Sequence, residues 1–173
     1  ADIYVSGDNR AFGRESAKFM AEKLNGEGNI VILRGMQVEI DVERYEGAME
    51  VFNQHEGITV LGAEHGNWNR ARAHEVMSAF LTRFDNIDAV WASDDDMALG
   101  VEQAITEAGR QDEMWVLGGA GMKEMVKRVQ EGDPMFPADI TYPPGMIGAG
   151  IVLAVANLTG GDEVGHHEMI PAH

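Results

Sequence analysis

The sequence predicts an α/β protein with a doubly wound, mainly parallel sheet that carries helices on both of its faces. Short apolar runs, of the kind buried within a parallel sheet, alternate along the chain with stretches of helical periodicity. One strand and its helix together take roughly 25 to 30 residues, which is typical of parallel strands joined by right-handed crossovers. The chain has 173 residues, 45% of them hydrophobic, so it can bury the core of one domain.

The individual elements follow from local patterns. Residues 29–33 form an apolar run typical of a buried strand, and apolar side chains recur at helical spacing through residues 69–84. Asp41 is the predicted N-cap of the second helix, and Gly109 ends the fourth. Residues 160–173 are polar and contain no predicted element. The predicted strands are residues 2–5, 29–33, 58–61, 87–92, 115–118 and 138–141, and the predicted helices are residues 10–24, 42–53, 69–84, 97–108, 122–130 and 145–158.

Composition restricts the possible partners. The net charge of −16, from 13 basic and 29 acidic residues, argues against a nucleic acid or an anionic membrane surface, because phosphate contacts need clustered lysine and arginine. The chain has no cysteine, which excludes disulfides and thiolate chemistry. No apolar run approaches the ~20 residues of a membrane-spanning helix. The amino terminus lacks the features of a signal peptide, so we expect any export signal to have been removed or to lie outside this sequence.

Motifs for enzymatic chemistry are missing. No glycine-rich phosphate loop follows the first strand, and neither Ser6 nor Ser93 has the G-x-S-x-G setting of a hydrolase nucleophile. The histidines do not have the spacing of a zinc site, so we expect neither a metal nor a cofactor. A phosphoacceptor receiver domain needs an aspartate at the end of the third strand, where this sequence has Glu64. A binding protein is therefore favoured, with a small α/β enzyme as a weaker alternative.

Three consecutive aspartates follow the fourth predicted strand. Side chains at the carboxyl end of a strand in an open α/β sheet project into the crevice where such folds bind ligands. Asp94 lies nearest the strand end, and we expect it to contact the ligand. Asp95 and Asp96 are expected to serve as capping and first-turn residues of the helix that follows, because the positive end of the helix dipole favours negative charge.

Four prominent residues fall at this same edge of the predicted sheet: Arg44, Trp68, Asp94 and Tyr142. Taken singly, the arginine could be a solvated helix residue and the two aromatic residues could be packing residues. Together, a guanidinium and a carboxylate offer several charge-assisted hydrogen bonds to hydroxyl groups, while an indole covers the apolar face of a sugar. The set predicts a site for a sugar or another polyol.

Three motifs resemble the ribose-binding-protein-like family, the type I periplasmic receptors of bacterial sugar transporters. Residues 89–100 resemble the family's strand followed by Asn-Asp-Glu-Met-Ala-Leu-Gly. Residues 43–47 are similar to its Arg-x-x-Gly helix start, and residues 67–70 resemble its Asp-Phe-Asp-Arg loop. The resemblance covers nearly all of the chain. It implies a solute-binding protein in the periplasm that binds a sugar or sugar alcohol and delivers it to an ABC transporter permease.

The resemblance also implies which residues contact the ligand. Arg44, Trp68, Asp94 and Tyr142 match sugar-contacting positions, the last two in place of an asparagine and a glutamine. The family's Gly-Phe-Asp-Gly loop usually supplies a ligand carboxylate, whereas this sequence has Ala120 in that loop. We expect Asp94 to have taken over the carboxylate role, which favours a sugar other than ribose or a sugar alcohol.

Family members have two lobes, and this chain resembles the carboxyl-terminal one. The resemblance implies that residues 1–8 are a crossing strand of the amino-terminal lobe, residues 9–142 the ligand-binding lobe, and residues 143–173 a helix and tail that return to the amino-terminal lobe. We expect weak or undetectable sugar binding by this lobe alone, since closure of two lobes surrounds the ligand. We also expect exposed apolar surface that drives association between copies of the chain.

The hinge between the lobes is expected at two crossings. The first comprises Ser6, Gly7 and Asp8, and the second comprises Pro143 and Pro144. Glycine is conformationally permissive and proline is stiff, so both types suit a crossing. An alternative function is the effector-binding domain of a lac-repressor-type transcription regulator, which resembles the same receptors but carries an amino-terminal DNA-binding module.

Overall fold

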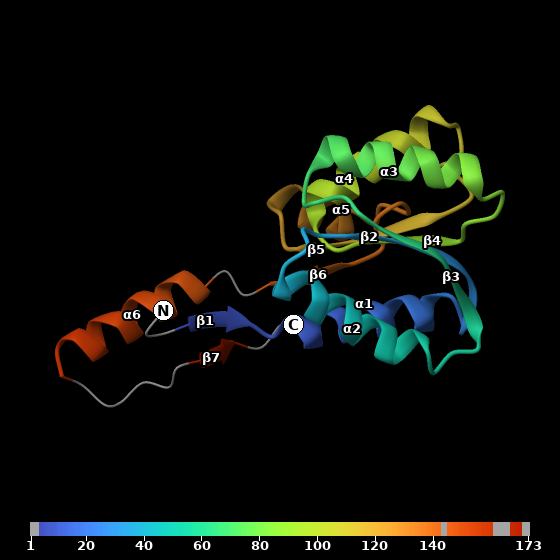
Figure 1. The fold of residues 1–173 in the computed structure, drawn as a ribbon. Helices are drawn as coiled ribbons and strands as arrows, with labels where there is room; N and C mark the ends of the chain where they lie inside the picture. The colour runs from blue at the N-terminus through green and yellow to red at the C-terminus, as the bar shows by residue number, and fades with distance from the viewer. Residues whose placement is uncertain (1–3, 143–144, 161–166, 171–173) are drawn as a thin grey trace.

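The computed structural model describes residues 4–142, 145–160 and 167–170. It contains a five-stranded sheet between two layers of helices, and a smaller two-stranded sheet to one side (Figure 1). The strands are β1 (Tyr4–Gly7), β2 (Glu27–Arg34), β3 (Gly57–His65), β4 (Ala89–Ala92), β5 (Trp115–Ala120), β6 (Asp139–Thr141) and β7 (His167–Ile170). The helices are α1 (Asn9–Lys23), α2 (Glu39–Phe52), α3 (Arg70–Arg83), α4 (Asp95–Glu107), α5 (Lys123–Gln130) and α6 (Met146–Leu158).

The strand order of the main sheet determines where a ligand site can form. The order is β3-β2-β4-β5-β6 and every pairing is parallel. From β2 the chain goes first to β3 on one side and then to β4 on the other, so the order reverses between β2 and β4. Open α/β sheets bind ligands outside the carboxyl ends of the strands at such a switch point.

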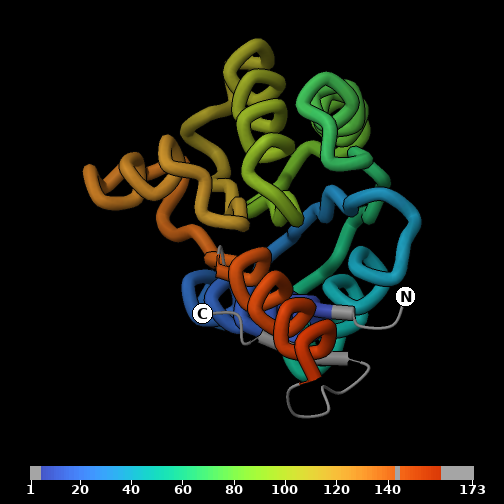
Figure 2. Tube along the Cα trace, turned by 90° about the vertical axis from the view of Figure 1, so that its left-hand side faces the viewer, coloured from blue at the N-terminus to red at the C-terminus, as the bar shows by residue number. Residues whose placement is uncertain are grey.

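The two helix layers bury separate parts of the core. Helices α1 and α2 cover one face of the sheet, and α3, α4 and α5 cover the other, as the turned view also shows (Figures 1 and 2). Phe12, Met20 and Trp91 are at most 1% exposed beneath the first layer, and Met77 and Val101 are fully buried beneath the second. Apolar burial on this scale is the main favourable term in folding. The predicted fold class is confirmed.

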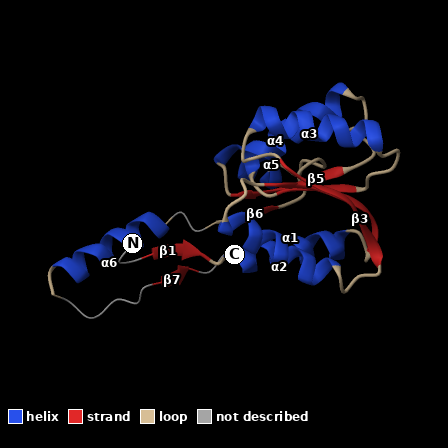
Figure 3. Ribbon diagram, in the orientation of Figure 1, coloured by secondary structure: helices blue, strands red, loops and turns tan. Residues whose placement is uncertain are grey.

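The remaining elements lie beside the main sheet. Strand β1 pairs in parallel with β7, from Tyr4 opposite His167 to Gly7 opposite Ile170, and α6 packs against β1 (Figure 3). Helix α6 has no buried residue among those described, and Leu158 is 84% exposed. Its apolar side chains therefore lack a covering layer within the described part of the chain.

Several predicted boundaries were wrong. Helix α2 begins at Glu39 after an extended Val38, so Asp41 is not its N-cap. Strand β3 continues through His65, because the expected loop after Leu61 pairs with the end of β2 instead. Strand β7 was not predicted.

The first predicted hinge crossing is partly strand, since Ser6 and Gly7 belong to β1. Asp8 is the N-cap of α1 and accepts a hydrogen bond from the Ala11 amide at 2.7 Å. The second predicted crossing, Pro143 and Pro144, lies outside the described residues.

Candidate functional site

All four residues predicted to contact a ligand line one cavity of about 250 Å³ at the carboxyl edge of the main sheet. Arg44 comes from α2, Trp68 from the loop between β3 and α3, Asp94 from the loop after β4, and Tyr142 from the end of β6. Arg44, Trp68 and Asp94 follow strands on the two sides of the switch point, and Tyr142 follows the edge strand β6, so the topology brings together residues that lie far apart in the sequence. The cavity is lined by Ile40, Arg44, Trp68, Asp94, Ala120, Tyr142 and Met146.

Arg44 is the buried cation of the site. It is 7% exposed, and it donates to the Asn9 side-chain oxygen at 3.2 Å and to the Ser93 carbonyl at 2.7 Å. Its guanidinium carbon lies 4.1 Å from the Phe12 ring centre and 5.0 Å from that of Tyr142. Burial lowers its pKa, but an arginine remains charged at neutral pH. The structure thus holds a positive charge against two aromatic faces.

Asp94 combines two roles that the sequence analysis had separated. It is the N-cap of α4, since its Oδ1 atom accepts a hydrogen bond from the Met97 amide at 2.8 Å. It also lines the cavity and is half-buried. Burial raises its pKa, and Asp96 adds to the rise while Arg44 opposes it. The expectation that Asp95 and Asp96 would supply the cap was wrong, because Asp94 makes the cap bond.

Asp95 instead holds the loop that follows β5. It is 1% exposed and accepts hydrogen bonds from the Gly119 amide at 2.8 Å and the Met122 amide at 2.7 Å. Next to it, both carboxyl oxygens of Asp139 are buried. Burial and the neighbouring Asp95 raise the pKa of Asp139 to about 7. Asp139 therefore keeps its proton up to nearly neutral pH.

Asp96 is the surface member of the aspartate triplet. Its Oδ1 atom lies 2.7 Å from Nη2 of Arg70 at the start of α3, and both side chains are exposed. This pair connects α3 and α4 without reaching the cavity, as expected of a first-turn residue.

Trp68 occupies an unusual backbone position. Both Asn67 and Trp68 have left-handed conformations, with φ of 58° and 51°. Its indole packs against the core beneath α3 and α4 and against Gly35. The indole nitrogen is buried and makes no hydrogen bond within the described residues. Trp68 therefore offers the cavity an aromatic ring rather than a polar group.

Tyr142 connects the cavity to β1. Its hydroxyl oxygen accepts a hydrogen bond from the Gly7 amide at 2.9 Å, and its ring meets Phe12 edge-on with centres 6.2 Å apart. A Cβ atom at Gly7 would lie 2.5 Å from the Tyr142 ring, so only glycine fits at this position. Tyr142, which forms one wall of the cavity, therefore contacts the predicted first crossing at Gly7.

Ala120 forms an apolar part of the cavity wall. Its φ of 103° is rare for a residue with a side chain, and Gly121 follows with φ of 82°. Such strain persists only where the surroundings enforce it, and it concentrates at functional sites. Because Ala120 has only a methyl group, Asp94 is the one carboxylate among the described residues that line the cavity.

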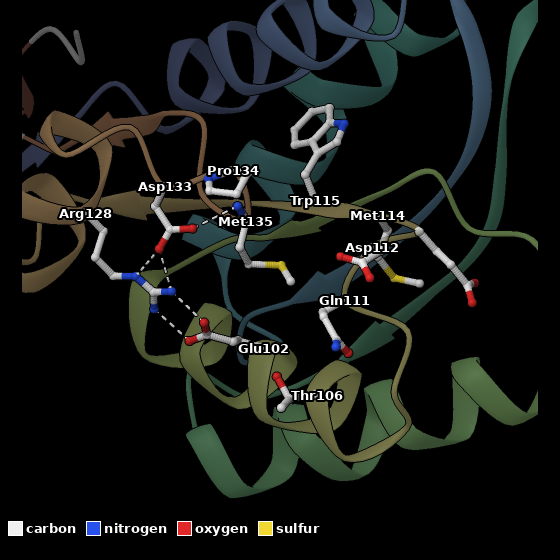
Figure 4. Close-up of a pocket in the computed structure, with 11 residues that line it drawn as sticks. Glu102, Thr106, Gln111, Asp112, Met114, Trp115, Arg128, Asp133, Pro134 and Met135 are labelled. Atoms are coloured by element: carbon white, nitrogen blue, oxygen red, sulfur yellow. Dashed lines mark hydrogen bonds and ion pairs between the residues drawn. The ribbon is translucent and has the colours of Figure 1, made fainter.

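A larger cavity of about 540 Å³ lies at the opposite, amino end of the strands (Figure 4). Arg128 points there at Glu102 and Asp133, with N–O distances of 2.5 and 2.7 Å. Hydrogen bonding to Glu102 is the main cause that raises the pKa of Arg128. Because two carboxylates already neutralise this guanidinium, the cavity offers a ligand no unpaired cation, despite its size.

The described residues were also compared with the arrangements typical of metal sites and of membrane-spanning helices. No cluster of three or more histidine, aspartate or glutamate side chains in the described ranges has the arrangement of a metal site. Among the helices described here, none has the length and apolar character needed to cross a membrane.

Comparisons with known proteins agree with the fold. The chain is 34% identical to the D-allose-binding periplasmic protein of Escherichia coli over 150 residues, which are 86% of this chain and 48% of that protein. It is 36% identical to the xylitol-binding protein of Mycolicibacterium smegmatis over 131 residues, which are 75% of this chain and 37% of that protein. The chain thus spans half or less of these relatives.

A solved structure shows the same fold. The solute-binding protein of an ABC transporter from Bacillus halodurans, crystallised with myo-inositol, superposes with a TM-score of 0.90 at 27% identity, over 100% of this chain and 60% of that one. The family described as the periplasmic binding protein domain matches residues 1–163. It is a family of solute-binding proteins rather than enzymes. The chain therefore belongs to the periplasmic binding protein domain family.

Proposed function

We propose that this chain is the ligand-binding lobe of a solute-binding protein that captures a sugar or sugar alcohol for an ABC transporter. The supporting observation is the convergence of Arg44, Trp68, Asp94 and Tyr142 on one cavity at the switch point. A polyhydroxylated ligand uses every member of that set. The guanidinium donates to hydroxyl oxygens, the carboxylate accepts from hydroxyl groups, and the two aromatic rings cover C–H faces.

The named ligands of the relatives agree with that chemistry. D-allose, xylitol and myo-inositol share several adjacent hydroxyl groups and carry no charge. The relatives reported above are named as binding proteins and none as a transcription regulator, so no observation favours the regulator alternative. The periplasmic location of the E. coli relative supports the periplasm for this chain, with a transporter permease as its partner.

The proposal also divides the chain into three segments. Residues 9–142 form the ligand lobe, and residues 1–8 and 143–173 belong to a second lobe that closes over the cavity. Two features support this division: β1, α6 and β7 lie beside the main sheet, and apolar α6 is exposed (Figure 1). Met146 of α6 already lines the cavity, as expected of an element that faces the ligand from the second lobe.

Titration of the chain with D-allose, xylitol and myo-inositol tests the proposal, with backbone and indole NMR signals as the readout. We expect millimolar-range binding that shifts signals around Trp68, because half a cleft leaves the ligand partly solvated. Asp94→Ala should remove the response, whereas Asp112→Ala in the larger cavity should leave it intact. Micromolar or tighter binding by this chain would contradict the half-cleft proposal. Shifts confined to the larger cavity would contradict the site.

The exposed face of α6 supports a separate proposal, which is that copies of the chain associate with one another. Ile147, Ile151 and Val152 are 60 to 72% exposed on a helix without a charged residue. We expect copies of the chain to associate through this face, since contiguous apolar surface drives self-association. Light scattering should show association that falls when Ile151 is replaced by lysine. A monomer at all concentrations would exclude it.

A further inference from the structure

Gly35, the first residue after β2, is held from two sides. Its amide donates to Oδ1 of Asp41 at 2.7 Å, and its carbonyl accepts from Nδ1 of His65 at 2.7 Å. Because a carbonyl can only accept, Nδ1 of the histidine carries the proton in this contact. Asp41 is 1% exposed, and its other oxygen accepts from Arg34 at 2.6 Å. This clamp fixes the peptide planes on both sides of Gly35.

The indole of Trp68 lies directly on the clamped glycine. A Cβ atom at Gly35 would come within 2.2 Å of the indole Cε2 and 2.3 Å of Nε1, so any side chain there collides with the ring. Gly35 has no positive φ, so backbone conformation does not require glycine at this position. The residue is needed for close approach alone, and its Cα surface forms the platform on which the indole rests.

The loop that carries Trp68 needs such support. Two consecutive non-glycine residues, Asn67 and Trp68, occupy the left-handed region, which costs free energy at each position. The loop is also tied to the end of β2, since the Gly66 amide donates to the Arg34 carbonyl at 2.8 Å. The surroundings of β2 therefore enforce the strained turn that aims the indole.

We propose that Asp41, Gly35 and His65 are positioning residues that set the orientation of Trp68 in the ligand cavity. Asp41 and His65 immobilise the glycine platform, and the platform fixes the plane of the ring that covers the sugar. The inference deepens the proposed function, and its consequence for sugar binding rests on it. The orientation of Trp68 itself does not depend on any ligand.

Fluorine NMR of the chain labelled with 5-fluorotryptophan tests the proposal. The chain has three tryptophans, so the spectrum has three signals, and Trp68→Phe assigns the relevant one. We expect Gly35→Ala and Asp41→Asn to shift or broaden the Trp68 signal while the signals of Trp91 and Trp115 stay in place. His65→Phe, which keeps a ring but removes the donor, should shift the same signal by less.

Asp88→Asn is the matched control, because Asp88 accepts from the Asn29 amide at 2.6 Å near the other end of β2. Like Asp41→Asn, it removes the charge from a comparable side-chain-to-backbone bond, and it should leave the Trp68 signal unmoved. An unmoved Trp68 signal in Asp41→Asn, or an equal shift in Asp88→Asn, would overturn the proposal. If Gly35→Ala fails to fold, Gly35→Ala with Trp68→Phe should restore folding, because the smaller ring vacates the space.

The same variants separate the two proposals. If the sugar proposal holds, Asp41→Asn should weaken the titration response several-fold and Asp88→Asn should not. If the Trp68 signal moves in Asp41→Asn but sugar shifts only signals of the larger cavity, the positioning proposal stands and the proposed sugar site is wrong. If sugar binds and neither Gly35→Ala nor Asp41→Asn changes the Trp68 signal, the proposed ligand class is supported and the positioning proposal is wrong.

Discussion

The two ends of the main sheet each hold an arginine, and the surroundings of the two guanidinium groups differ. At the amino end, Arg128 forms ion pairs with Glu102 and Asp133. At the carboxyl end, Arg44 is more deeply buried, donates to neutral oxygens of Asn9 and Ser93, and forms no ion pair within the described residues.

This difference explains why cavity size is a poor guide to the site. The paired arginine joins α4 to the segment after α5, and a ligand would have to displace a carboxylate to reach it. Arg44 retains its charge without a carboxylate partner, beside an aspartate that faces the same space. A hydroxyl-rich ligand can bridge those two groups, so we propose the smaller cavity as the binding site.

Replacing each of these two arginines by lysine should produce the largest difference between the two ends of the sheet. Lysine keeps the charge but loses the planar fork, so Arg44→Lys should weaken sugar binding about tenfold or more, the cost of a lost charged hydrogen bond. Arg128→Lys should leave binding unchanged and lower stability by about 1 kcal/mol, as expected for a partly exposed ion pair. Chemical-shift titration and urea unfolding measure the two effects. Equal loss of binding in both variants would remove the distinction between the two ends.

The two roles of Asp94 can be separated by a pair of substitutions. Asp94→Ala should cost about 1 kcal/mol of stability, because alanine cannot cap α4. Asp94→Asn should keep most of that stability, since asparagine also caps helices, yet it should still weaken sugar binding because the charge is lost. Urea unfolding gives the first comparison and titration the second. Unchanged affinity in both variants would exclude Asp94 from the site.

Replacing Asp139, at the carboxyl end of the sheet, should cause a smaller change in stability, and this change should depend on pH. Its pKa is about 7 in the folded protein, above its ordinary value. Between those values the folded protein holds a proton that the unfolded chain has released, so stability falls as pH rises through this window. Asp139→Asn cannot titrate, and it should gain stability over the unaltered chain between about pH 5 and pH 8, on the order of 1 kcal/mol after solvent screening.

Urea unfolding of both proteins at the two pH values measures this gain. Asp112→Asn, at an exposed position near the opposite end, serves as the control and should show no such gain. A constant stability difference between Asp139→Asn and the unaltered chain across this pH range would contradict the raised pKa of Asp139.

Much of the fold could be predicted because its signals are local. Apolar runs and helical spacing identify six of the seven strands and all six helices found in the described residues. Strand β7 escaped prediction because His167 to Ile170 has no apolar run, and its partner β1 lies far away in sequence. The end of β3 escaped for a similar reason, since Glu64 and His65 are defined as strand by pairing with β2.

The candidate site shows the same division between local and tertiary signals. Arg44, Trp68, Asp94 and Tyr142 could be found because each lies near the end of a predicted strand or the start of a predicted helix, at one edge of the predicted sheet. Asp41 has the sequence pattern of an N-cap, but tertiary contacts to Arg34 and Gly35 determine its role. Asp139 gives no signal in the sequence, because only the fold places it beside Asp95.

The most direct test of the sugar site is the detection of intermolecular nuclear Overhauser effects between sugar C–H protons and tryptophan indole protons. Trp68 lines the cavity beside Arg44, and Trp115 lines the larger cavity beside Arg128. With saturating xylitol or D-allose, our account predicts effects to Trp68 that disappear in Asp94→Ala. Effects to Trp115 in the absence of any to Trp68 would contradict it.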